Sequence, residues 1–186
     1  KAKDCLTQEK IILAGEFTDD EKEILKNYQF LTSKPRLYLL NGKLEEVAMS
    51  DLAQFGKNCL VIDITTELEA EGLSKEERTA LSLPIESETD ILIKKSYELL
   101  NLITFLTTGE DETRAWTIKE GGTAPVAGGV IHSDFEKTFI KAEVVFWKDL
   151  LNAGGYSKAR EQGLVKTEGK EYIVKDGDVI EIKHGV

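Results

Sequence analysis

The sequence predicts two folds in series, an α/β segment over residues 1–97 and an α+β segment over residues 98–186. In the first segment, two short apolar runs at 36–40 and 59–64 alternate with stretches of helical periodicity, a pattern typical of a parallel α/β sheet. In the second segment, two runs rich in β-branched and aromatic residues flank a glycine and an acidic turn, which indicates a β-hairpin over 102–118. Two strands are too few for a stable sheet, so we expect the first segment to pair with something outside it.

Capping signals and apolar spacing predict the helices of the first segment. Thr18 and Glu21 have the spacing of a capping box, and Pro35 is expected to end the helix that follows. Its inward face is expected to carry Ile24, Leu25, Tyr28 and Leu31. The further helices expected are Met49–Phe55 closed by Gly56, one from Ser74 with a capping glutamate at Glu77, and one over 89–100 with Ile91, Ile93, Tyr97 and Leu100 inward.

The second segment reads as short strands and helices joined by glycine-rich turns. Strand alternation places Trp116 and Ile118 on one face of the hairpin. The glycine-rich run 121–129 is expected to be a loop, and not a phosphate cradle, because it lacks a strand–loop–helix context. The remaining elements expected are a helix opened by a capping box at Ser133 and running to 140, a strand over 141–147, helical patches within 149–162 broken at Gly154-Gly155, a hairpin of 164–166 with 171–174, and a last strand over 179–183.

The charge balance excludes a dedicated, electrostatically driven nucleic-acid binder. The formal net charge is −10, with a hydrophobic share of 41% and a charged share of 31%, which is the composition of a folded globular protein. Residues 100–186 carry 11 Lys/Arg and 14 Asp/Glu, a net charge of −3, and residues 1–99 carry a net charge of −7. Any contact with RNA would therefore have to come from a local patch or act through protein.

Cysteine usage and hydropathy favour a reducing, cytoplasmic setting. Cys5 and Cys59 are too few for a disulfide framework and lack the spacing of metal ligands. The sequence has no signal peptide, and its apolar runs are shorter than a membrane span of about 20 residues, so no membrane partner is expected. The first residue is Lys1 rather than Met, which suggests a fragment or a processed chain.

Three stretches of the second segment carry a family resemblance. They read LITFLTTGEDETRAWTI from residue 102, GTAPVAGGVIHSDFEKTFIKAEV from residue 122 and EGKEYIVKDGDVIEIKHGV from residue 168. Together they closely resemble the C-terminal TGS domain of the YchF-type ribosome-binding NTPases, which are relatives of the Obg GTPases. The resemblance implies a β-grasp architecture, a small mixed sheet wrapped round one helix, for residues 98–186. It also implies the ribosome, as protein or rRNA, as a partner.

The first segment resembles the end of the P-loop NTPase domain of the same family. LTSKPRLYLLN resembles the segment leading to the base-reading fourth motif, and TTELEAE resembles the fifth-motif region. On this resemblance residues 1–97 are the C-terminal portion of that domain, and its missing portion is an expected partner. The sequence contains no G-x-x-x-x-G-K-[ST] motif, whose amides and lysine cradle phosphates and whose hydroxyl holds Mg²⁺. The chain alone is therefore expected to have no catalytic residues, whereas the parent family implies ATP or GTP hydrolysis with Mg²⁺.

Asn41 and Gly42 are the candidate nucleotide-base contacts. The family pattern places Asn, an apolar residue, any residue and then Glu at this loop, whereas this chain has Asn41-Gly42-Lys43-Leu44. Asn41 is retained, and its amide has the groups to address a base edge. In the fifth-motif region, Thr65-Thr66-Glu67 replaces the family's Ser-Ala-Lys-like run. Asn-Gly is also a common turn dipeptide, so a strand-end turn is the alternative interpretation.

Four residues of the second segment are nominated as a partner-binding patch: Arg114, Trp116, Lys119 and His132. Arginine and tryptophan are enriched at binding hot spots, although alternation also allows Trp116 a place in the core. His132, Ser133 and Asp134 are adjacent in sequence and cannot converge as a catalytic triad, so a helix-capping cluster is expected there. His184 is expected to be an exposed strand residue. The acidic turn Glu110-Asp111-Glu112 has the groups for a cation, but a solvated turn is the simpler interpretation.

These observations lead to two functional hypotheses of different classes. The first is a binding or regulatory module of a ribosome-associated, nucleotide-dependent NTPase. The second is a nucleotide-binding enzyme fragment that still recognises a base through Asn41.

Overall fold

A computed structural model describes residues 1–47, 49–109 and 112–185 of the chain. The chain divides into two compact units, Lys1–Leu99 and Leu100–Val186, which are called here the first and second unit. Each is described by itself. Across the part of the chain that the structure describes, no helix has the length and apolar character needed to cross a membrane.

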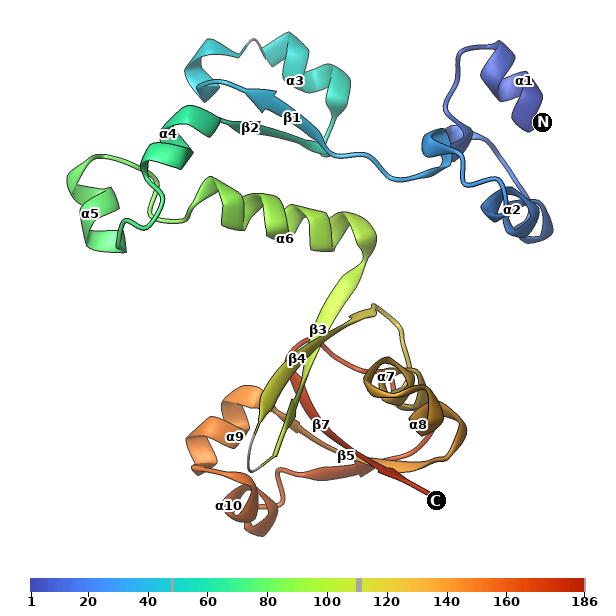
Figure 1. The fold of residues 1–186 in the computed structure, drawn as a ribbon, viewed down its shortest axis with the longest axis vertical. Helices are drawn as coiled ribbons and strands as arrows, with labels where there is room; N and C mark the ends of the chain where they lie inside the picture. The colour runs from blue at the N-terminus through green and yellow to red at the C-terminus, as the bar shows by residue number, and fades with distance from the viewer. Residues whose placement is uncertain (48, 110–111, 186) are drawn as a thin grey trace. The chain divides into compact units, whose positions relative to one another are not determined.

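The first unit is built round a parallel pair of strands, β1 (Tyr38–Asn41) and β2 (Cys59–Ile62). Its described helices are α1 (Ala2–Thr7), η1 (Ile12–Ala14), α2 (Asp19–Lys26), η2 (Leu31–Ser33), η3 (Leu44–Glu46), α3 (Met49–Phe55), α4 (Ile64–Glu69), α5 (Lys75–Ala80) and α6 (Glu88–Leu100). Figure 1 shows α3 and α6 on opposite sides of the β1–β2 pair. The contacts agree, because Tyr38 packs its ring on Phe55 of α3 at 4.6 Å, whereas Leu39 faces a cavity shared with α6. The predicted parallel strand pair is confirmed.

The capping signals are confirmed, but the burial expected of the helices is not. Thr18 and Glu21 form a complete capping box at α2, and Ser74 and Glu77 form another at α5. α2 ends at Lys26, well before Pro35, and of the side chains expected to face inward Leu25 is half-buried whereas the other three lie in solvent. The side chains concerned are exposed by 60% at Ile24, 66% at Tyr28 and 78% at Leu31. A capping box fixes where a helix begins, whereas burial needs a second surface, and none covers this face among the described residues.

Two boundaries near β2 and α6 also differ from expectation. The predicted strand over 59–64 ends at Ile62, because Asp63 caps a new helix, α4, through its bond to the amide of Thr66 at 3.1 Å. In α6, Ile93 and Leu100 are exposed by 51% and 48% rather than inward. Ile91 and Tyr97 are half-buried as expected, and Leu92, which was not expected to be inward, is among the residues that face the cavity.

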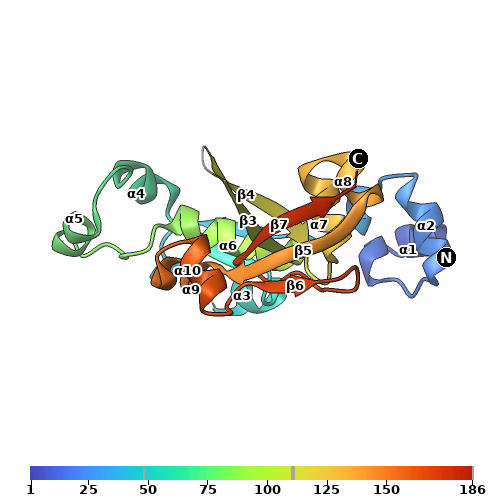
Figure 2. The ribbon, with the colours of Figure 1, turned by 90° about the horizontal axis from the view of Figure 1, so that it is seen from below.

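The second unit is a mixed five-stranded sheet with the described order β4-β3-β7-β5-β6. Its strands are β3 (Leu102–Thr108), β4 (Thr113–Lys119), β5 (Phe139–Phe146), β6 (Lys166–Glu168) and β7 (Asp178–His184). Pairing is antiparallel except for β3 with β7, which run parallel. Figure 2 shows β6 beside β5 at one edge of the sheet. The β3–β4 hairpin and the last strand are confirmed.

Helices lie on both faces of this sheet: α7 (Ala124–Ile131), α8 (Ser133–Lys137), α9 (Trp147–Ala153) and α10 (Tyr156–Glu161). α7 covers one face, where Ala124 and Ala127, both fully buried, pack in the core with Phe105 and Ile118. On the other face, Arg160 of α10 forms an ion pair with Glu143 of β5. The break between α9 and α10 at Gly154-Gly155 is confirmed.

Two predictions for the second unit are wrong. The run 121–129 is not a loop, because α7 occupies most of it, with Pro125 in the first turn where its missing N–H costs nothing. The small residues of this run allow α7 to approach the sheet closely, which single-residue propensity does not reveal. The predicted hairpin of 164–166 with 171–174 is also absent from the described pairing: β6 pairs with β5, and Ile173 bridges to Thr123.

The ends of two elements also differ. The helix predicted from Ser133 to 140 ends at Lys137, and His132 rather than Ser133 is its cap. The predicted strand over 141–147 begins earlier, at Phe139, and ends at Phe146, so Trp147 opens α9 instead.

Candidate functional site

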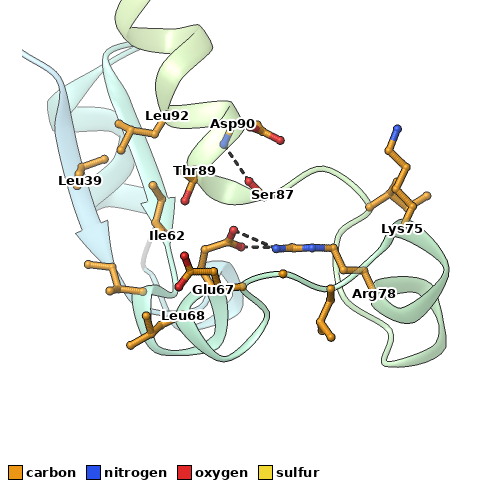
Figure 3. A pocket seen from close by; sticks show the side chains of 15 residues that line it. Leu39, Ile62, Glu67, Leu68, Lys75, Arg78, Ser87, Thr89, Asp90 and Leu92 are labelled. Atoms are coloured by element: carbon orange, nitrogen blue, oxygen red, sulfur yellow. Dashed lines mark hydrogen bonds and ion pairs between the residues drawn. The ribbon is translucent and has the colours of Figure 1, made fainter.

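A cavity of about 650 Å³ lies within the first unit, in the range that accommodates small molecules. Figure 3 shows Leu39 and Ile62 from the strands and Leu92 from α6 forming an apolar wall. Glu67 of α4 and Arg78 of α5 face each other across the other side. The cavity is therefore mainly apolar, with one charged pair at its border.

The Glu67–Arg78 ion pair ties α5 to α4. Two guanidinium nitrogens of Arg78 donate to the two carboxylate oxygens of Glu67, at 3.3 and 3.1 Å, and one also donates to the carbonyl of Ala70 at 3.2 Å. The side chains are only 7% and 15% exposed. Such two-pronged geometry satisfies both charges, which is the condition for burying them at acceptable cost. Burial works to raise the pKa of Glu67, but the hydrogen bonds from Arg78 and from the amide of Glu88 outweigh it and leave the pKa lowered.

Glu88 and Asp63 complete a group of charges behind this pair. Burial raises the pKa of Glu88, opposed by a hydrogen bond from the amide of Asp63 and reinforced by the charges of Glu67 and Asp63. One oxygen of Glu88, Oε2, is buried without a hydrogen-bond partner. Asp63 has a lowered pKa, chiefly because the hydroxyl of Thr66 donates to it at 2.6 Å, with the Thr66 amide adding to the effect. Arg78 thus acts on two carboxylates, Glu67 and Glu88, whereas the nearby cation for Asp63 is Lys43.

The described residues do not form an assembled catalytic centre here. Of the polar groups at the cavity border, Glu67 and Arg78 pair with each other and Ser87 accepts from the amide of Asp90, and among the described residues no three of His, Cys, Asp and Glu are placed to hold a metal ion.

Asn41 and Gly42 lie beside this cavity but are not among the described residues that line it. Asn41 ends β1, and its side-chain oxygen accepts from the amide of Ile64, the first residue of α4, at 3.2 Å. The amide of Gly42 donates to the carbonyl of Ile62 at 3.0 Å, and Gly42 has φ of +150°, a conformation that favours glycine. The Asn41 oxygen therefore joins the end of β1 to the start of α4.

In the second unit, Arg114 and Trp116 are brought together on β4, which is an edge strand. The guanidinium carbon of Arg114 lies 4.2 Å above the centroid of the Trp116 ring, the geometry of a cation–π contact. Trp116 donates from its indole nitrogen to the hydroxyl of Thr107 at 2.9 Å and packs against the core. The tryptophan is thus half-buried, and it holds the exposed arginine against the surface.

Neither Lys119 nor His132 lies on the face of β4 that carries Arg114 and Trp116. Lys119 is five positions from Arg114 in a regular strand, so its side chain lies on the opposite face. His132 caps α8, where its Nδ1 accepts from the amide of Asp134 at 3.3 Å, which confirms the predicted capping cluster. His184 is exposed, as predicted. The candidate cation turn at 110–112 lies largely outside the described residues, which omit 110 and 111.

The glycine-rich run does have a strand–loop–helix context, contrary to the prediction, because it leads from β4 into α7. It still offers little to a phosphate. The amide of Ala124 donates to the carbonyl of Tyr172 at 2.9 Å, and Pro125 has no N–H to donate.

No pattern in the sequence predicts the buried pair of Glu67 and Arg78. Arg78 sits in a short helix whose other residues are mostly polar, so periodicity marks no inward face there. A capping box at Ser74 was the only detectable signal, and it concerns the start of α5. Pairing between charges eleven residues apart depends on how α4 and α5 pack, which local patterns do not specify.

Comparison with known proteins shows which proteins this chain resembles. The family model YchF-GTPase_C, described as a protein of unknown function (DUF933), matches residues 102–185. "Ribosome-binding ATPase YchF" of Bacillus subtilis is 42% identical over 200 aligned positions, covering 100% of this chain and 55% of that protein. "Obg-like ATPase 1" of Caenorhabditis elegans is 36% identical, covering 98% and 50%. The structure of the Schizosaccharomyces pombe YchF GTPase superposes with a TM-score of 0.79 at 30% identity, covering 95% of this chain and 50% of that one.

The fold is thus that of mixed α/β proteins of the YchF GTPase type, established by a solved structure as well as by sequence. The chain belongs to the YchF family and matches its C-terminal part, as the resemblance of the second segment predicted. It spans about half the length of the curated relatives that it matches.

Proposed function

We propose that the chain is the ribosome-binding, regulatory C-terminal region of a YchF-type, Obg-related NTPase. Residues 98–186, which contain the second unit, serve as a β-grasp TGS domain that binds the ribosome. Residues 1–97, which make up most of the first unit, are the end of a P-loop NTPase domain whose remaining portion is their natural partner. This proposal is supported by relatives named as ribosome-binding ATPases whose matches cover 90–100% of the chain. It also implies a cytoplasmic protein, with ATP or GTP and Mg²⁺ as cofactors of the complete domain.

The observation that carries the binding role is the Arg114–Trp116 pair. An arginine held over a tryptophan ring on an edge strand has lost much of its freedom before binding, which reduces the entropy cost of a contact. Both residue types are enriched at hot spots. Because the second unit carries a net charge of −3, a compact patch of this kind has to supply the attraction that a general basic surface would otherwise provide.

The alternative is recognition of a nucleotide base through Asn41 and Gly42. One observation favours it: Asn41 lies where β1 ends, at the carboxyl end of parallel strands where such sheets bind ligands. Against it, the Asn41 oxygen already accepts from Ile64. Equilibrium dialysis of the chain with ATP and with GTP separates the two hypotheses, since base recognition alone predicts retention that is lost in Asn41→Ala.

Co-sedimentation with purified ribosomes tests the proposal. Arg114→Ala should lower the retained fraction while changing the free energy of unfolding by no more than about 1 kcal/mol, the size of an exposed cation–π contact. Lys119→Ala is the matched control, because it removes a cation from the same strand on the opposite face. Equal retention of wild type and Arg114→Ala would remove Arg114 from the binding surface. No retention of the wild-type chain would refute the proposed function.

A further inference from the structure

Three aromatic rings from two segments, the start of α8 and the end of β7, meet on the surface of the second unit. His132 caps α8, Phe135 lies within α8 and His184 is the last residue of β7. The Phe135 and His184 rings are stacked, with centroids 4.1 Å apart and planes at 20°. The His132 ring lies 5.5 Å from Phe135, tilted by 45°. This His–Phe stack (His132, Phe135, His184) contains both histidines of the sequence.

The stack is held rigidly by the core beneath it. Ile180, Ile182 and His184 alternate along one face of β7, from a residue that is 1% exposed to one that lies in solvent. These three residues of β7 therefore run from the core to the surface, where His184 contacts Phe135 of α8. α8 is fixed in turn, because a Cβ added to Gly128 of α7 would lie only 3.3 Å from the Cβ of Phe135. The rings are thus positioned before any ligand arrives.

The hydrogen bonds of the two histidines assign different roles to their outer nitrogens. Nδ1 of His132 accepts from the Asp134 amide, so the neutral ring carries its proton on Nε2 and can donate from there. Nδ1 of His184 lies 3.0 Å from the carbonyl of Gly185, which only accepts, so that nitrogen donates and Nε2 is left as an acceptor. The stack therefore offers a flat ring face with one donor and one acceptor beside it.

We propose that the His–Phe stack binds an unpaired base of single-stranded RNA. Proteins recognise such bases by stacking them on phenylalanine, tyrosine, tryptophan or histidine and by hydrogen-bonding their edges. A protein partner is less well matched, because hot spots sit in apolar, desolvated surroundings, whereas the residues of α8 beside Phe135 are exposed and polar at Ser133, Asp134 and Lys137. The inference rests on the proposed ribosome association and narrows that partner to RNA.

The charge of the unit predicts how this binding behaves. With a net charge of −3, the second unit neutralises few phosphates, so few counterions are released on binding. Stacking of bases on the rings adds a contribution that releases no counterions, so the affinity should fall only shallowly as salt is raised. A basic groove would show the opposite, a steep loss of affinity as salt is raised.

The test is fluorescence anisotropy of a labelled single-stranded oligoadenylate RNA titrated with the whole chain over a salt series. His184→Asn removes an exposed ring while keeping a donor for Gly185, and Phe135→Leu keeps apolar bulk. Each should weaken binding roughly tenfold, since base–aromatic stacking is worth about 1–3 kcal/mol. His132→Asn retains a good cap for α8 and should weaken binding less. Phe146→Leu is the matched control: Phe146 is 38% exposed and lies at the opposite end of β5 from the residue paired with His184.

The outcomes are distinct. Equal affinity of wild type, His184→Asn and Phe146→Leu would overturn the inference, and so would a steep salt dependence. If the wild-type chain binds ribosomes but not the oligonucleotide, the RNA-base assignment fails and a protein contact replaces it, while the proposed function stands. Thermal unfolding of each variant by circular dichroism shows whether a loss of binding is a loss of fold. His184→Asn is the decisive variant if Phe135→Leu is destabilised.

Discussion

Breaking the Glu67–Arg78 pair should unfold the first unit without affecting the second. Arg78→Met keeps the length of the side chain but removes the guanidinium group that donates to Glu67 and to Ala70. The carboxylate of Glu67, only 15% exposed, is then left beside Glu88 and Asp63 with no counter-charge from Arg78. Removing one partner of a buried pair costs about 3–5 kcal/mol.

That magnitude is large against the stability of a small unit. With a dependence of stability on urea of about 1.5 kcal/mol per molar, a loss of about 3 kcal/mol lowers the unfolding midpoint by about 2 M. Replacing both members by apolar residues, as in Glu67→Leu with Arg78→Met, should recover most of the loss, because the desolvation cost of both charges disappears. The double variant therefore separates an uncompensated charge from a simple loss of packing.

The chain provides its own internal control for this assay. Both tryptophans, Trp116 and Trp147, belong to the second unit, whereas both units contribute helix to the far-ultraviolet circular dichroism. In Arg78→Met, the circular-dichroism transition should acquire an early phase while the tryptophan transition stays in place. An unchanged circular-dichroism midpoint, or a double variant as unstable as Arg78→Met alone, would refute the reasoning.

Three further outcomes are expected. Glu88 has a raised pKa in the folded state, so its ionised form opposes folding at neutral pH, and this cost is lost as pH falls through that pKa. Glu88→Gln should therefore raise the free energy of unfolding by about 1 kcal/mol at pH 7. Urea titrations at a series of pH values should show this gain shrinking towards acid pH. The purified chain should hydrolyse neither ATP nor GTP above buffer in a phosphate-release assay, and turnover that survives repurification but is abolished by a substitution in this chain would contradict this. Gly177 has φ of +83°, and an added Cβ would lie 2.6 Å from the Trp147 ring, so Gly177→Ala should destabilise the second unit by about 2 kcal/mol or more, seen as a lower melting temperature by tryptophan fluorescence.

Patterns of a few neighbouring residues correctly predicted the features that depend only on those residues. The capping boxes at Thr18 and Ser74, the β3–β4 hairpin and the final strand depend on a few adjacent residues, and the structure confirms them. α7 was missed because its glycines and alanines have weak or mixed propensities, and their value lies in close approach to the sheet. The family resemblance was predicted from sequence, and the comparisons bear it out.

Contacts between distant segments were not predictable in the same way. Burial of Arg78 follows from the packing of α4 on α5, and the stacking of His184 on Phe135 follows from β7 ending beside α8. Alternation did predict the face of Trp116, but whether that face is core or surface depends on where α7 ends over the sheet. Side chains alternate between the two faces of a strand, so Arg114 and Lys119, which are an odd number of positions apart, lie on opposite faces of β4. The sequence alone was enough to predict this.

The central claim is that the second unit alone carries the ribosome contact. Residues 98–186 should therefore be expressed separately, shown by circular dichroism to unfold cooperatively, and added in excess to ribosomes already loaded with the labelled whole chain. We expect the separate unit to displace the whole chain from sedimenting ribosomes, and the Arg114→Ala form of the unit to displace it less. A folded second unit that leaves the whole chain bound at saturating excess would contradict the account, because the contact would then require the first unit.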